Sequence, residues 1–190
     1  MRKQKLNLLL TDLFLFVLLI VIEQVTKYMA VVHLKNQAAI PLIDGALELR
    51  YLENRGAAFG MLQNQKVFLI FVAVIILIIF TYILVKTPAQ KKYIWGHTAL
   101  VLIAAGGAGN MIDRIRLDYV VDFIYFSLIN FPIFNVADIF VTVGTILLVI
   151  LLLFIYKEED LYFLSFKTKT YREIKENPEI TDAQTSVENK

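Results

Sequence analysis

The chain has 190 residues, 58% of them hydrophobic, and its mean hydropathy is +0.64. A soluble domain averages roughly 45–50% apolar residues, so this composition predicts an integral membrane protein. The formal net charge of +2 is too small to indicate a nucleic-acid partner, and no basic patch is interleaved with stacking aromatic residues.

The residue types that are missing narrow the chemistry. The sequence holds no cysteine, which excludes thiol nucleophiles, thiolate metal ligands and disulfides. Its two histidines, His33 and His97, belong to no H-E-x-x-H zinc motif, and we expect both near the membrane faces and without a catalytic role. A G-x-S-x-G nucleophile motif is absent as well. We therefore expect no metal and no cofactor, and any hydrolytic chemistry falls to carboxylates.

Four apolar segments are each close to the ~20 residues that a helix needs to cross the hydrocarbon core. They cover roughly residues 8–32, 67–85, 94–112 and 136–156. The first exceeds the ~7–15 apolar residues of a signal peptide and lacks a small-residue cleavage site, so we expect it to be retained. The sequence predicts an all-α membrane protein with four transmembrane helices.

Lysine and arginine set the expected orientation. They are dense before the first apolar segment and in the short link between the second and the third. Because such residues mark cytoplasmic loops, we expect both termini in the cytoplasm. The outward ends of the helices then carry Lys27, Asn110, Asp113, Arg114 and Asp138. This convergence predicts a site near the outer leaflet.

The first outward link is predicted to form a small extracytoplasmic sheet, with strands at about residues 43–60. Residues 47–51 alternate apolar and charged side chains with a period of two, as a strand does. Gly56 and Gly60 follow, and glycine permits backbone conformations that side chains forbid. The membrane domain is expected to end at residue 156, because the polar, mixed-charge residues 157–190 are typical of a disordered tail, here cytoplasmic.

Two aspartates flank the almost wholly apolar segment between residues 122 and 138. Acids beside hydrocarbon are costly and indicate function by default. Asp138 follows Asn135, a strong N-cap residue, so completing a helix cap is the alternative interpretation of Asp138. Asp122 has apolar neighbours and no adjacent cation. If the two carboxyls meet, they share one proton; Asp122 would hold it while the helix start keeps Asp138 ionised.

Other polar residues near the helix ends have structural interpretations. The small residues 105–109 predict close helix packing. Asn110 can donate to and accept from a peptide backbone, whereas we expect Asp113 to be structural. Glu23 and Lys27 stand four apart in the order that favours an ion pair, which would brace the polar site.

With these residues in view, the chain resembles the signal peptidase II family of bacterial intramembrane aspartyl proteases over about residues 10–156. Four motifs carry the resemblance, and their order and spacing make them specific as a set. They are Asn54-Arg55-Gly56-Ala57-Ala58-Phe59 (N-x-G-A-A-F), Gly109-Asn110-Met111-Ile112-Asp113-Arg114 (G-N-x-x-D-R), Val121-Asp122-Phe123 (V-D-F) and Phe134-Asn135-Val136-Ala137-Asp138 (F-N-x-A-D). Two features depart from the family: Glu23 stands where D-x-x-[ST]-K has Asp, and the glycines before Asn110 are arranged differently from G-G-A-x-G-N.

The resemblance implies that Asp122 and Asp138 remove the signal peptide of a prolipoprotein by cleaving before its diacylglyceryl-modified Cys. It implies a β-cradle over the site and a set of residues that position substrate or site: Asn54, Gly56, Asn110, Arg114 and Asn135, with Glu23 and Lys27. The expected partners are diacylglyceryl-prolipoproteins, membrane phospholipids and globomycin-like inhibitors. The protein would act as a monomer in the bacterial cytoplasmic membrane.

A proton-coupled carrier or channel is the alternative from another class, because intramembrane acids also form proton relays. A relay would place polar residues through the bilayer to both faces. The inner halves of the predicted helices carry almost no polar residues. This distribution favours the peptidase.

Overall fold

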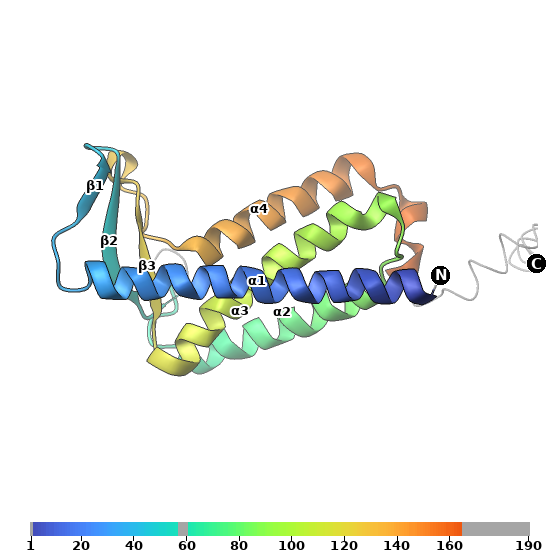
Figure 1. Cartoon of the computed structure of the whole chain (residues 1–190), viewed down its shortest axis with the longest axis horizontal. Helices are drawn as coiled ribbons and strands as arrows, with labels where there is room; N and C mark the ends of the chain where they lie inside the picture. Colours follow the sequence, from blue (N-terminus) through green and yellow to red (C-terminus); the bar gives the residue numbers. More distant parts are fainter. Residues whose placement is uncertain (1, 57–60, 165–190) are drawn as a thin grey trace, which may run out of the picture.

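Four long helices lie alongside one another, and a small sheet lies across one end of them (Figure 1). The structure, a computed structural model, describes residues 2–56 and 61–164. The helices are α1 (Arg2–Leu34), α2 (Lys66–Lys86), α3 (Ile94–Leu117) and α4 (Val136–Ile150). The expected combination of apolar helices with a small sheet is confirmed.

Three of the helices are long and apolar enough to cross a membrane: α1, α2, and α4 together with the π-helical turn Leu151–Ile155 that continues it. Most of their apolar side chains are exposed, and α2 has no buried residue at all among those described. A surface of this kind is stable only in lipid. α1 starts at Arg2 rather than near residue 8, and its polar first turns extend beyond the apolar segment.

α3 is the central helix and contacts the other three. Small residues allow this close approach, as predicted: a Cβ added at Gly106 would lie 2.4 Å from the Ala137 carbonyl oxygen of α4. Similarly, a Cβ on Gly144 of α4 would lie 2.8 Å from the Ala99 carbonyl oxygen. α3 runs beyond the expected residue 112 to Leu117, where Asp118 takes a left-handed conformation and ends it.

The sheet has three antiparallel strands in the order β1 (Ile40–Ile43), β2 (Leu47–Asn54) and β3 (Val120–Tyr125). β2 falls within the range 43–60 expected for strands, and β1 lies beside it. Residues 57–60 of that range lie outside the described part of the chain. β3 was not predicted. It brings Asp122 into the sheet, and its neighbours Val121 and Phe123 pack against Ala30 and Leu34 of α1.

The helices are joined and followed by short 3₁₀ turns at Lys91–Tyr93, Ser127–Ile129 and Glu158–Leu164. The last turn packs against the end of the helices, where the Tyr93 hydroxyl donates to the Asp160 carbonyl oxygen at 2.9 Å. Residues 158–164, in the first part of the expected tail, thus form a 3₁₀ turn in this structure. Residues 165–190 lie outside the described residues.

Candidate active site

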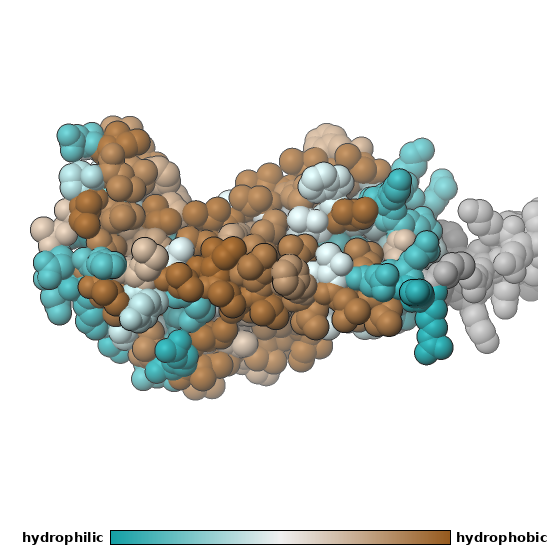
Figure 2. All heavy atoms as spheres, in the orientation of Figure 1, coloured by the Kyte–Doolittle hydropathy of each residue, from teal (hydrophilic) through white to brown (hydrophobic). Residues whose placement is uncertain are grey.

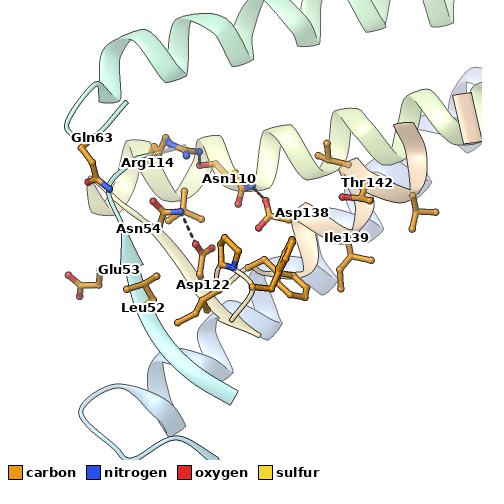
Figure 3. Close-up of a pocket in the computed structure, with 17 residues that line it drawn as sticks. Leu52, Glu53, Asn54, Gln63, Asn110, Arg114, Asp122, Asp138, Ile139 and Thr142 are labelled. Atoms are coloured by element: carbon orange, nitrogen blue, oxygen red, sulfur yellow. Dashed lines mark hydrogen bonds between the residues drawn. The ribbon is translucent and has the colours of Figure 1, made fainter. Parts of the chain in front are cut away.

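A cavity of about 690 Å³ opens where the sheet meets the start of α4. Asp122 enters it from β3 and Asp138 from the first turn of α4, and Figure 3 shows both among the labelled side chains of its wall. Apolar side chains from residues 131–134 and from α4 make up much of the remaining wall. The two aspartates selected from the sequence thus share one pocket.

Asp122 is buried, with 2% of its surface exposed. Its Oδ2 accepts a hydrogen bond from the Asn54 amide at 2.9 Å, and its Oδ1 accepts one from the Asn135 amide at 2.7 Å. Burial raises the pKa of Asp122 from its ordinary 3.8 to about 6; the charge of Asp138 acts in the same direction and the two amide donors oppose it. This carboxyl therefore keeps its proton to a higher pH than an exposed aspartate does.

Asp138 is part of a capping box at the start of α4. Its Oδ2 accepts from the Asn135 backbone N–H at 3.0 Å, and its own N–H donates to Asn135 Oδ1 at 3.2 Å. Its other oxygen, Oδ1, accepts from the Asn110 amide at 2.9 Å. The predicted N-cap is confirmed, and Asp138 both completes this cap and lines the pocket.

Asn135 connects the two aspartates. It is completely buried, and its backbone N–H binds Asp138 while its side-chain amide binds Asp122. The same amide donates to Asn110 Oδ1 at 3.1 Å. Two acids that lie sixteen residues apart in the sequence are therefore held through a single asparagine.

Arg114 lines the pocket and is held by Gly56 beside it. The Arg114 guanidinium donates to the Gly56 carbonyl oxygen at 2.7 Å and to the Asn110 carbonyl oxygen at 3.2 Å. The Gly56 N–H in turn donates to Asn54 Oδ1 at 2.9 Å, which orients the Asn54 amide towards Asp122. A Cβ at Gly56 would lie 2.5 Å from the Met61 carbonyl oxygen, so this turn requires a glycine.

A buried charge cluster supports Asn110 from the side of α1. Lys27 forms ion pairs with Glu23 and, at 2.9 Å, with Asp113, and it donates to Asn110 Oδ1 at 2.9 Å. The expected Glu23–Lys27 pair is confirmed. Asp113 also accepts the Val121 N–H at 3.0 Å, which ties α3 to the strand residue beside the first aspartate. This contact agrees with a structural role for Asp113.

Glu23 is accommodated by a glycine on the neighbouring helix. A Cβ at Gly109 would lie 2.6 Å from Glu23 Oε2, so the side chain occupies space that any other residue at 109 would fill. Gln24, which we did not single out, links the same elements: its amide donates to Glu23 Oε2 and to Asp113 Oδ1, each at 3.0 Å. Its position next to Glu23 in an apolar segment was the available signal.

A second buried polar pair lies away from the pocket. His97 Nδ1 is 2.7 Å from Asp12 Oδ2, and His97 is 1% exposed between α1 and α3. This pair lies in the half of the helices away from the pocket, so the expectation that the inner halves are nearly free of polar residues is wrong here. Asp12, an acid in the first apolar segment, was the signal in the sequence that could have indicated this pair. Its partner His97 lies 85 residues further along the chain.

The described residues contain no group of three or more His, Asp or Glu side chains arranged to hold a metal ion. The fold and the pocket define a helical membrane protein with a pair of linked carboxylates at one end of its helices. Comparisons of the sequence and the structure with known proteins then identify its family.

The family model described as signal peptidase (SPase) II matches residues 15–154. Lipoprotein signal peptidases of Streptococcus pyogenes serotypes M5 (strain Manfredo) and M18 (strain MGAS8232) are each 44% identical over 144 residues, which are 76% of this chain and 91% of theirs. A bacterial membrane enzyme solved by the in meso method at 2.3 Å resolution superposes with a TM-score of 0.69 at 35% identity, covering 75% of this chain and 87% of its own. A second, at 1.9 Å, gives a TM-score of 0.66 at 34% identity, covering 77% and 94%.

The chain belongs to the signal peptidase II family. This confirms the resemblance found in the sequence motifs. It makes the protein a peptidase, and together with the apolar helices it makes it a multi-pass bacterial membrane protein.

Proposed function

We propose that the protein is an aspartyl endopeptidase that removes the signal peptide from diacylglyceryl-modified prolipoproteins by cleaving before the lipidated Cys. The relatives at 44% identity are lipoprotein signal peptidases, which supports this substrate class. The observation that carries the proposal is the pair of Asp122 and Asp138 in one pocket, both bound to Asn135.

The two carboxyls divide the work because their surroundings differ. Buried Asp122, with its raised pKa, holds the shared proton, and Asp138 at the start of α4 acts as the base. Asp138 takes a proton from a water molecule whose oxygen bonds to the carbonyl carbon, while Asp122 gives its proton to the carbonyl oxygen. Asp138 then gives its proton to the nitrogen as the C–N bond of the tetrahedral intermediate breaks. A hydroxyl of the intermediate returns its proton to Asp122 as the new carboxyl group forms, so the pair again holds one proton.

The supporting residues act by orientation. Asn54, Asn110 and Asn135 hold the carboxyl oxygens at hydrogen-bond distance. Arg114 and Gly56 shape the outer wall, and Glu23 and Lys27 brace Asn110. The same cavity would take globomycin-like inhibitors.

The membrane arrangement that we propose has four spans, both termini in the cytoplasm and the pocket towards the outer leaflet. α3 has 24 residues and is about 36 Å long at 1.5 Å per residue, enough to cross the hydrocarbon core. Its polar and small residues face the other three helices, so it needs less apolar surface than they do. In this arrangement the protein acts as a monomer.

The carrier alternative would draw on the inner pair of Asp12 and His97. Asp12 and Lys27 are fifteen residues apart on α1, about 22 Å, and residues 13–22 between them are all apolar. This apolar stretch argues against a proton relay along α1.

The test uses the purified protein and a lipidated precursor in bilayers. Release of the signal peptide should be lost in Asp122→Asn and in Asp138→Asn. Asp118→Asn is the matched control, because Asp118 is an exposed aspartate that pairs with Lys66 outside the pocket. An active Asp122→Asn variant, or proton flux in liposomes without cleavage, would overturn the proposal.

A further inference from the structure

The tip of the sheet carries large apolar side chains that are strongly exposed. Leu128 is 74% and Ile129 69% exposed, both in the turn after β3. The Leu128 N–H donates to the Ala46 carbonyl oxygen at 3.5 Å, which joins this turn to the β1–β2 turn. We call the exposed apolar side chains here the tip patch: Leu42, Ile43, Phe126, Leu128 and Ile129.

The tip patch continues the apolar surface of the helices. Figure 2 shows hydrophobic residues over the middle of the helices and again over the upper part of the sheet end, with hydrophilic residues at the far edges. Exposed apolar residues on α1 run from Leu6 to Val32, 27 residues or about 40 Å. This length matches a bilayer including its interfacial regions, so the end of α1 lies in an interface. In Figure 1 the sheet lies level with that end of α1.

The residues at the margin of the patch suit a membrane interface. The Arg50 guanidinium lies over the Tyr125 ring, 5.8 Å from its centroid. Tyrosine and long basic side chains are enriched where a membrane protein meets the lipid headgroups. The margin of the patch thus holds an aromatic and a cationic side chain, together with the acidic residues Asp44 and Glu48.

A protein partner fits the tip patch poorly. A stable interface buries about 800 Å² per partner and uses roughly 20–30 residues on each side. The patch has five apolar side chains, two on β1 and three on or beside the turn Ser127–Ile129. Insertion of a few side chains among lipid acyl chains does not require so large an area.

We propose that the tip patch is a lipid-binding surface that inserts into the same leaflet interface as the outer end of α1. Leu128 and Ile129 enter furthest, and Arg50 contacts lipid phosphate. The sheet is then fixed at two places, by α1 and by the lipid. Since β3 carries Asp122, this contact sets the depth of the pocket in the membrane. The insertion does not depend on the proposed cleavage.

The experiment measures depth by fluorescence. Trp95 is the one tryptophan in the sequence, so Trp95→Phe gives a background without one. Leu128→Trp or Ile129→Trp is added, and the full-length protein is reconstituted in phosphatidylcholine and phosphatidylglycerol vesicles with brominated acyl chains. The control is Gln37→Trp, since Gln37 is an exposed polar residue in the loop beyond α1.

We expect brominated lipid to quench Leu128→Trp and Ile129→Trp and to shift their emission to shorter wavelength, while Gln37→Trp keeps the emission of a water-exposed indole. Equal, weak quenching at all three positions would overturn the proposal. A short-wavelength emission at residue 128 that disappears when the protein is diluted in lipid would also overturn it, because that result indicates contact with a second copy of the chain. These readouts are independent of cleavage, so an inactive protein still tests the inference.

Discussion

Asn135 offers a sharp test, because one side chain both caps α4 and holds the two aspartates. Asn135→Ser keeps a hydroxyl that can accept the Asp138 N–H, but it removes the amide that donates to Asp122. Leaving an oxygen of the buried Asp122 carboxyl without its donor costs about 1–3 kcal/mol, which corresponds to about a 5- to 150-fold decrease in kcat/KM. Asn135→Ala loses the cap as well, and about 1 kcal/mol of stability with it.

The assay pairs two measurements on the purified protein. Initial rates with a lipidated fluorogenic precursor give kcat/KM, and thermal unfolding in detergent gives stability. The serine variant should lose activity with little change in unfolding temperature, and the alanine variant should lose both. Wild-type activity in Asn135→Ser would refute the view that this amide aligns the pair.

Three further predictions follow from the same geometry. The pKa of Asp122 near 6 means that the protonated acid is lost above this pH, so kcat/KM should fall about tenfold per pH unit there; a flat profile would contradict it. Because the folded state binds this proton more tightly than the unfolded chain, the free energy of unfolding should also decrease as the pH rises from 3.8 to about 6. Lys27→Met leaves two buried carboxylates without their cation and should cost about 3–5 kcal/mol, whereas Lys35→Met, at an exposed pair, should leave the unfolding temperature almost unchanged; equal unfolding temperatures of the two variants would exclude this reasoning. Gly106→Ala should destabilise by about 1–3 kcal/mol, because its Cβ meets a backbone oxygen of α4, while Gly107→Ala meets nothing within 4 Å and should be neutral or slightly stabilising in the same unfolding assay.

The sequence was most informative where local rules apply. Asn135 before Asp138 predicted an N-cap, and Glu23 four residues before Lys27 predicted an ion pair; the structure has both. The long apolar segments predicted the helices. Each of these signals depends on neighbours within about one helical turn.

Features that depend on distant parts of the chain were harder to predict. The residues of β3 show no alternation, because its first four side chains are all buried, so neither strand nor register was visible. The Asp12–His97 pair joins residues 85 positions apart, and only the folded helices bring them together. The pocket itself was predicted as a meeting of two acids, but Asn135 as their connection required coordinates.

The close fit of Glu23 against Gly109 also bears on how the sequence can vary. A methyl group at 109 has no room while the longer acid is present, yet shortening residue 23 to Asp would vacate that space. Gly109→Ala should therefore be harmful alone and tolerated together with Glu23→Asp. The two positions form a compensating pair across α1 and α3, and sequences with Glu at the first position should keep glycine at the second.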